Sequence, residues 1–220
     1  MTNVESRSCV GKRLSNRRVR WLVLLALAAA SCGSVPRTSY YTLRVPAPPE
    51  SKDPRTSGVV GVEHFRATEA LRDDRIVYYE SPTQMNFYQY HRWSADPATM
   101  LSDLTARRLD ESGAFAGVRR LPSRDAVDYV LRGSIMSFEE VDDSTGVRGR
   151  VAIQMSLVRA RDRKTLWSQS RQAESAAQGK GVPAVVEALN AACARVLDEL
   201  LPAVVAKVEQ DARENANPSQ

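Results

Sequence analysis

Residues 75–93 give the clearest indication of the fold. Two runs rich in apolar and aromatic residues, Arg75-Ile-Val-Tyr-Tyr-Glu80 and Met85-Asn-Phe-Tyr-Gln-Tyr-His-Arg-Trp93, flank the short segment Ser81-Pro-Thr-Gln84. β-Branched and aromatic residues favour extended structure, and serine and proline favour a tight turn. The stretch therefore predicts a β-hairpin.

A helix is expected directly after this hairpin. Asp96 can accept hydrogen bonds from the free backbone N–H groups of a first helical turn, and Pro97 loses no hydrogen bond at the first helical position. Apolar residues then recur at helical spacing as far as Leu109. Gly113 can close the helix in the left-handed conformation.

Further strands and a second helix complete the predicted domain. Strands are expected at residues 129–141 and 150–160, and the second alternates apolar and polar residues, which indicates one covered and one solvent-exposed face. A shorter strand is expected at residues 165–170, and an amphipathic helix at 182–208, which Pro202 should kink or divide. The predicted fold class is α+β, with a single, mainly antiparallel sheet and two helices packed on one face.

The first 31 residues have the features of a lipoprotein signal peptide. Six basic residues precede the apolar run of residues 21–30, and Ser31-Cys32-Gly33 follows. Ten apolar residues rise only about 15 Å as a helix, so a membrane-spanning helix is disfavoured. The small residues before Cys32 resemble a lipobox, in which the cysteine becomes the diacylated mature N-terminus, although Ala29 stands where a larger aliphatic residue is usual. An ordinary signal peptide, with Cys32 incidental, is the alternative.

This leader accounts for the basic character of the chain. It carries six basic residues and one acidic residue, which equals the net charge of +5 of the whole chain. The remaining residues carry 25 charges of each sign. A pI of about 9.3 therefore gives no reason to expect a nucleic-acid partner.

The rest of the chain divides into three predicted parts. Residues 32–57 are rich in proline and are expected to form an extended tether, interrupted at Tyr40-Tyr41-Thr42-Leu43, which should pair with the edge of the domain. The folded domain is predicted at residues 58–208. Residues 209–220 are expected to be a disordered tail.

No catalytic, cofactor or metal site is predicted. His64 and His91 are the only histidines, and no cysteine stands near either at zinc-ligand spacing. Cys193 lies on an apolar helical stripe and is expected to be buried. Glu139 and Glu140 are adjacent along a strand, so they should point to opposite faces and cannot share a substrate. The sequence therefore predicts a protein that is not an enzyme; a hydrolase with an unrecognised serine–histidine site is the alternative.

The predicted hairpin also has the composition of a binding surface. Six of the 14 aromatic residues fall within residues 78–93. Regular alternation would place Tyr88, Tyr90 and Arg92 on one face and Trp93 on the other, while helices can cover only one face. Tyrosine, tryptophan and arginine are enriched at recognition surfaces. We therefore predict that these four residues bind a partner; packing beneath a helix or loop is the alternative.

These segments resemble a known family. The run Arg75-Ile-Val-Tyr, the motif Tyr88-Gln-Tyr-His-Arg-Trp-Ser-Ala-Asp-Pro-Ala-Thr-Met-Leu101 and Gly113-Ala-Phe115 are similar to the auxiliary lipoproteins of ABC-type transport systems, including the paraquat-inducible protein C type. The resemblance covers nearly all of residues 32–208.

The resemblance implies a function and a set of partners. It implies a periplasm-facing accessory subunit that works with a mammalian-cell-entry (MCE) domain protein and an ABC permease and ATPase in lipid trafficking between the inner and outer membranes. Gly33 stands where an aspartate would signal retention in the inner membrane, which favours lipid anchoring in the outer membrane. The hairpin would bind the MCE-type partner or a second copy of the chain. A lipoprotein activator of a cell-wall synthase is the alternative function.

Overall fold

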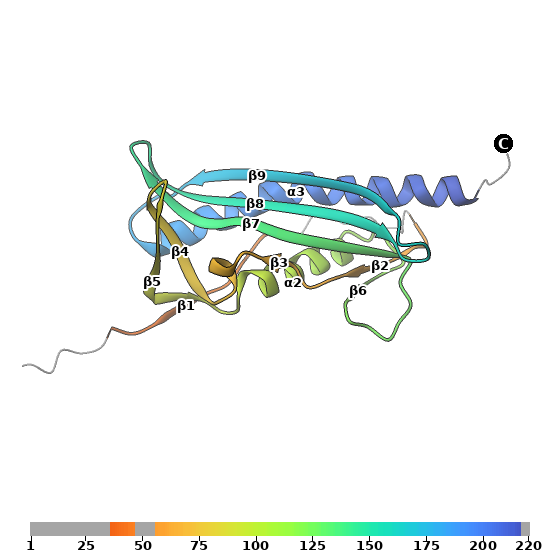
Figure 1. Cartoon of the computed structure of the whole chain (residues 1–220), viewed down its shortest axis with the longest axis horizontal. Helices are drawn as coiled ribbons and strands as arrows, with labels where there is room; N and C mark the ends of the chain where they lie inside the picture. Colours follow the sequence, from red (N-terminus) through yellow and green to blue (C-terminus); the bar gives the residue numbers. More distant parts are fainter. Residues whose placement is uncertain (1–35, 47–55, 217–220) are drawn as a thin grey trace, which may run out of the picture. The chain divides into compact units, whose positions relative to one another are not determined.

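The computed structural model describes residues 36–46 and 56–216 (Figure 1). The fold described below is that of the compact unit that begins at Thr38. The predicted signal peptide, Cys32 and the last four residues of the predicted tail lie outside the described residues.

The long strand β7 (Tyr129–Asp143) organises the sheet. On one edge it pairs antiparallel with β8 (Gly146–Arg159), which pairs antiparallel with β9 (Thr165–Ala176). The other edge of β7 pairs in parallel with three short strands: β2 (Val59–Val62), β3 (Arg66–Ala67) and β4 (Arg75–Ser81).

Three more strands extend this second edge. β5 (Gln84–Trp93) pairs antiparallel with β4 and forms the predicted hairpin, and β1 (Ser39–Tyr41) pairs in parallel with β5. β6 (Gly117–Arg120) pairs in parallel with β2, and the short 3₁₀ helix η1 (Glu69–Leu71) separates β3 from β4.

The sheet is mixed, which corrects the prediction of a mainly antiparallel sheet. It contains five parallel and three antiparallel strand pairs. Three of the parallel pairs form because β2, β3 and β4 lie one after another along the same edge of β7. These short strands are distant from β7 in the sequence. Local sequence patterns predict strands but contain no record of such distant pairing. The α+β class itself is confirmed.

The first long helix, α2 (Pro97–Glu111), begins as predicted. Asp96 accepts hydrogen bonds from the backbone nitrogen of Thr99 at 2.9 Å and from its hydroxyl at 2.7 Å. These bonds satisfy donors that have no partner within the first helical turn. Gly113 follows the helix with a φ of 61°, the left-handed conformation expected of it.

The second long helix, α3 (Val182–Ala216), is longer than predicted. Pro202 lies inside it without dividing it. The helix continues eight residues beyond the predicted end at Val208, so most of the predicted tail at residues 209–220 is helical. Asp211 is almost completely buried there by contacts with the sheet, which stabilise the added turns.

Both helices pack on the same face of the sheet. The alternating apolar side chains of β8 are buried on the face that α3 covers. An ion pair of 2.7 Å between Arg108 of α2 and Asp198 of α3 joins the two helices. This arrangement confirms the prediction that two helices cover one face, and it follows from the period-two pattern of β8.

A glycine permits the close approach of α3 to β8. A Cβ atom on Gly149 would lie 2.6 Å from the backbone nitrogen of Leu189, a distance that requires the helix to move. We expect Gly149→Ala to lower the free energy of unfolding by about 1–3 kcal/mol in a urea titration. Gly117→Ala is the matched control, because its Cβ would meet only the mobile guanidinium group of Arg119. Equal losses in the two variants would contradict this account.

Candidate functional site

The predicted binding surface lies on β1, β5 and β4, next to the carboxyl end of β7. Arg75 pairs with Arg92, whereas Val77 pairs with Phe87, so two steps along β4 correspond to five along β5. Such a bulge breaks the regular alternation of side chains. The faces predicted for the hairpin residues are therefore not maintained along the whole strand.

Tyr88 belongs to a half-buried aromatic cluster. Its hydroxyl donates a hydrogen bond of 2.8 Å to Glu140 of β7, and its ring lies 4.6 Å from that of Tyr78 and 5.8 Å from that of His91. Glu140 is only 6% exposed, and burial raises its pKa. Burial and the bond to Glu140 also raise the pKa of Tyr88. The side chain of Tyr88 is therefore held in one orientation by neighbours from three strands.

The same cluster attaches β1 to the hairpin. The hydroxyl of Tyr41 is hydrogen-bonded to His91 Nδ1 at 2.8 Å, and the two rings stack with centroids 5.8 Å apart. Tyr41, His91, Tyr88 and Tyr78 thus form a continuous row across β1, β5 and β4. The row fixes the geometry of this end of the sheet.

Glu139 and Glu140 have different partners, as their adjacent positions predict. Glu139 accepts a hydrogen bond from the backbone nitrogen of Phe138 at 2.6 Å and lies 4.0 Å from Arg150, whereas Glu140 is bonded to Tyr88. Burial raises the pKa of both carboxyl groups. The two carboxylates thus support strand packing through separate partners.

The structure separates the remaining predicted binding residues. Arg92 donates a hydrogen bond of 2.6 Å to Asp74 and is about one-third exposed. Tyr90 is half-buried, and among the described residues nothing forms a hydrogen bond or ring contact with it. Gln89 beside it is exposed. Tyr90 is therefore the predicted residue whose side chain is most available to a partner.

Trp93 lies in the core, so its assignment to a binding surface is wrong. It is 1% exposed, and its ring lies 5.1 Å from that of Phe138. Alternation left open which face of the hairpin other elements cover, and the contact with Phe138 of β7 puts Trp93 on the covered side. The alternative left open by the sequence, packing beneath a helix, applies to this residue.

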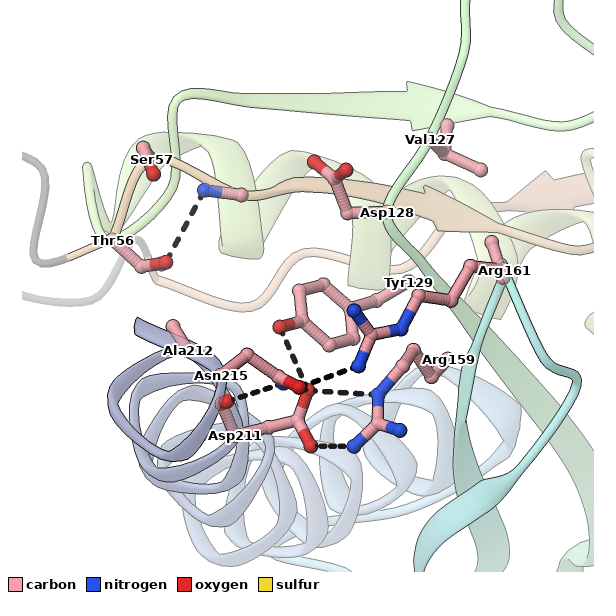
Figure 2. A pocket seen from close by; sticks show the side chains of 12 residues that line it. Thr56, Ser57, Val127, Asp128, Tyr129, Arg159, Arg161, Asp211, Ala212 and Asn215 are labelled. Atoms are coloured by element: carbon pink, nitrogen blue, oxygen red, sulfur yellow. Dashed lines mark hydrogen bonds and ion pairs between the residues drawn. The ribbon is translucent and has the colours of Figure 1, made fainter. Parts of the chain in front are cut away.

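A polar cavity of about 680 Å³ lies at the other end of β7, beside the last turns of α3 (Figure 2). Asp211 of α3 accepts hydrogen bonds from Arg159 Nε at 3.0 Å, from the hydroxyl of Tyr129 at 3.1 Å and from Asn215 Nδ2 at 3.0 Å. A second nitrogen of Arg159 also contacts Asp211, which gives a two-point ion pair. Figure 2 shows these side chains converging from β7, β8 and α3.

The charges of this network are mutually compensated. The bonds from Arg159 hold the pKa of Asp211 below its usual range, while burial raises that of Tyr129 to about 12. The sequence does not predict this network, because Asp211 lies in the predicted tail. One sequence feature indicates that the helix continues toward Asp211. Apolar residues keep their helical spacing past Pro202 as far as Val208, and Asp211 follows three residues later.

The described residues show no arrangement typical of a metal or hydrolase site. In this part of the chain, no three histidine, cysteine or acidic side chains are close enough to hold a metal ion. His91 is bonded to Tyr41, and neither histidine forms a hydrogen bond with a serine of the described segments. Cys193 is fully buried, and burial raises its pKa to about 12, so its thiol stays protonated. None of the helices described is long and apolar enough to cross a membrane.

Comparison with protein families gives a decisive match. Residues 41–200 match the family described as the ABC-type transport auxiliary lipoprotein component. The chain belongs to this family. The match begins at Tyr41 of the aromatic row and includes the hairpin, α2, the long strands and most of α3. Family membership identifies the protein as an auxiliary lipoprotein of ABC-type transport, with a place in the cell envelope.

Solved structures share the fold. Protein XCC0632 from Xanthomonas campestris superposes with a TM-score of 0.72 at 21% identity, covering 80% of this chain and 99% of its own. A second, uncharacterized protein superposes with a TM-score of 0.62 at 15% identity, covering 77% of this chain and 99% of its own. At such identities the likeness concerns the fold alone. No curated protein is similar enough in sequence to count as a match.

Proposed function

We propose that the protein is a non-catalytic accessory subunit of an MCE-type ABC transport system for lipid trafficking between the two membranes. Acylated Cys32 would anchor it in the outer membrane, with the domain facing the periplasm. Membership of the transport auxiliary family supports the transport role. The hairpin carries the binding role: its polar groups are held by internal partners, while Tyr90 has none among the described residues.

This geometry suits binding better than catalysis. Tyr88 is held by Glu140 and Arg92 by Asp74, so their positions change little when a partner arrives. A surface ordered in advance loses less conformational entropy on association. The Tyr90 ring is then presented from a fixed frame, as expected of a residue that contributes strongly to a protein interface.

Tyr90→Ala is expected to weaken binding of the MCE-domain partner by at least about tenfold while leaving the fold intact. Binding would be measured by cross-linking the tagged protein in membranes and quantifying the transporter subunits that co-purify. Gln172→Ala on β9 is the control, because this side chain is exposed and β8 and β7 separate it from the hairpin. Unchanged recovery of the partner with Tyr90→Ala would exclude the hairpin as the interface, and recovery of a cell-wall synthase in place of a transporter would favour the alternative function.

Acylation at Cys32 has its own test. Mass spectrometry of the purified protein is expected to give an N-terminal peptide that begins at Cys32 and carries diacylglyceryl and a further acyl chain. Cys32→Ser removes the thiol that would carry the lipid, so the mature variant should leave the membrane fraction. An unmodified N-terminus at another residue would contradict the proposed anchor.

A further inference from the structure

Residues 39–46, named here the N-terminal strap, are fixed to the domain. Within the strap, β1 pairs with β5, and the backbone oxygen of Tyr41 accepts a hydrogen bond of 2.6 Å from the nitrogen of Ser94. Leu43 and Val45 are buried in the core. The ordered domain thus begins well before residue 58, within the segment predicted to be a tether.

The strap is also tied to α3. The backbone nitrogen of Arg44 donates a hydrogen bond of 3.0 Å to Asn190 Oδ1, and Asn190 is itself buried. The strap is therefore held by the sheet on one side and by a helix on the other. It cannot be drawn out as a tether without loss of core packing.

The link to the proposed anchor is consequently short. Six residues separate Cys32 from Ser39, so full extension allows about 25 Å between them. The 15 residues of β7 span about 50 Å. The link is thus about half as long as the domain, and it keeps the β1 end of the sheet close to the membrane.

The strap presents a distinct row of side chains to solvent. Its residues alternate, with Tyr40, Thr42 and Arg44 exposed and the residues between them covered. Tyr40 is 65% exposed, and Met136 is the only other large hydrophobic side chain exposed in the described segments. The row contains no acidic residue, and no described residue forms an ion pair with Arg44.

This chemistry fits a lipid surface. Tyrosine is enriched at the headgroup level of bilayers, where its ring and hydroxyl meet apolar and polar surroundings. Arginine near a membrane is attracted to anionic headgroups. The link adds Arg37 and no acidic residue, so its charge also favours an anionic surface.

We propose that Tyr40, Thr42 and Arg44 of the N-terminal strap lie against the bilayer and contact anionic phospholipid headgroups. The proposal rests on the acylation of Cys32 that the proposed function includes. Tyr40 pairs with Arg92, which pairs with Arg75 of β4, and Arg75 precedes the Val77–Glu139 pair by two residues, so the strap is level with about residue 137 of β7. The polar cavity begins at Tyr129, about 25 Å further along β7, and is held away from the membrane.

Fluorescence quenching tests this orientation on the full, acylated protein. Tyr40→Cys is labelled with a fluorophore and reconstituted in phosphatidylethanolamine vesicles that contain phosphatidylglycerol and brominated lipid. Ala126→Cys, exposed in the loop before β7, is the matched control at the cavity end. The buried thiol of Cys193 is not expected to react. We expect quenching at position 40 to exceed that at position 126 by about threefold or more, as for a headgroup-level side chain.

Three other results would overturn the proposal in distinguishable ways. Equal quenching at both positions, in protein that is acylated and floats with the vesicles, would refute the orientation and leave the anchor intact. In cross-linked membranes, a label at position 40 could be shielded from water and yet not be quenched by brominated lipid. This result would assign Tyr40, Thr42 and Arg44 to contact with a protein partner. Absence of acyl groups from Cys32 would remove both the anchor and this inference.

Discussion

Trp93→Ala is expected to lower the free energy of unfolding by about 3–5 kcal/mol, the range typical of truncating a large aromatic side chain in a core. Trp93 is 1% exposed and packs against Phe138 at the point where the hairpin meets β7. The cavity left behind would lie between β5 and β7, whose backbones are fixed by their pairing in the sheet. Guanidinium unfolding of the mature chain carrying Cys32→Ser measures the loss directly.

Two further variants separate packing from binding. Trp93→Phe should cost clearly less than Trp93→Ala, because the indole N–H is buried with no acceptor among the described residues, so its removal breaks no hydrogen bond. Tyr90→Ala should change stability by no more than about 1 kcal/mol. A stable Trp93→Ala variant that fails to capture the MCE-domain partner would restore the original assignment of Trp93 to the binding surface.

The contrast between Tyr90 and Trp93 shows where sequence reasoning about the hairpin succeeds. The two strands, their turn and the Asp96 cap depend on local preferences of a few neighbouring residues, and all three are as predicted. The bulge between Phe87 and Arg92 depends on how β4 and β5 pair, so it has no local signature. Which face of β5 other elements cover is likewise a property of the whole fold, and it puts Trp93 in the core.

The N-terminal strap and the strand order also depend on contacts between distant residues, which local sequence patterns do not predict. The pairing of Tyr41 with the domain edge could be predicted from its short apolar run, but not the burial of Leu43 and Val45 beneath distant elements. The parallel pairs on β7 likewise join segments tens of residues apart. Local composition therefore predicts a tether that is too long and a sheet that is mainly antiparallel instead of mixed.

The end of α3 is attached through a buried polar network that periodicity does not reveal. Asp211 is 2% exposed and is bonded to Arg159, Tyr129 and Asn215. A helix end with exposed polar residues would ordinarily fray. The charged network in the cavity makes residues 209–216 part of the domain, beyond the segment that matches the family.

Asp211→Asn is accordingly expected to lower the free energy of unfolding by about 2–3 kcal/mol, because it removes the buried carboxylate that pairs with Arg159 and leaves only the more exposed Asp162 as its counterion. Hydrogen exchange of residues 209–216 should rise in the same variant, since the last turns of α3 lose their attachment to β8. Arg159→Met with Asp211→Leu should recover much of the loss, because the replacement removes both charges and fills similar volume. If the double variant were as unstable as the single one, packing and not the charge would be the cause.

The pH dependence gives an independent check on the same pair. Arg159 lowers the pKa of Asp211 in the folded state, so the folded protein binds this proton less readily than the unfolded chain does. The stabilisation is complete above the unfolded value of about 4 and is lost as the pH falls through the lower folded pKa. The free energy of unfolding of the unaltered protein should therefore decline more steeply over this acidic range than that of Asp211→Asn. Parallel pH profiles would show that Asp211 is not ionised against Arg159, and the extension of α3 would then need another cause.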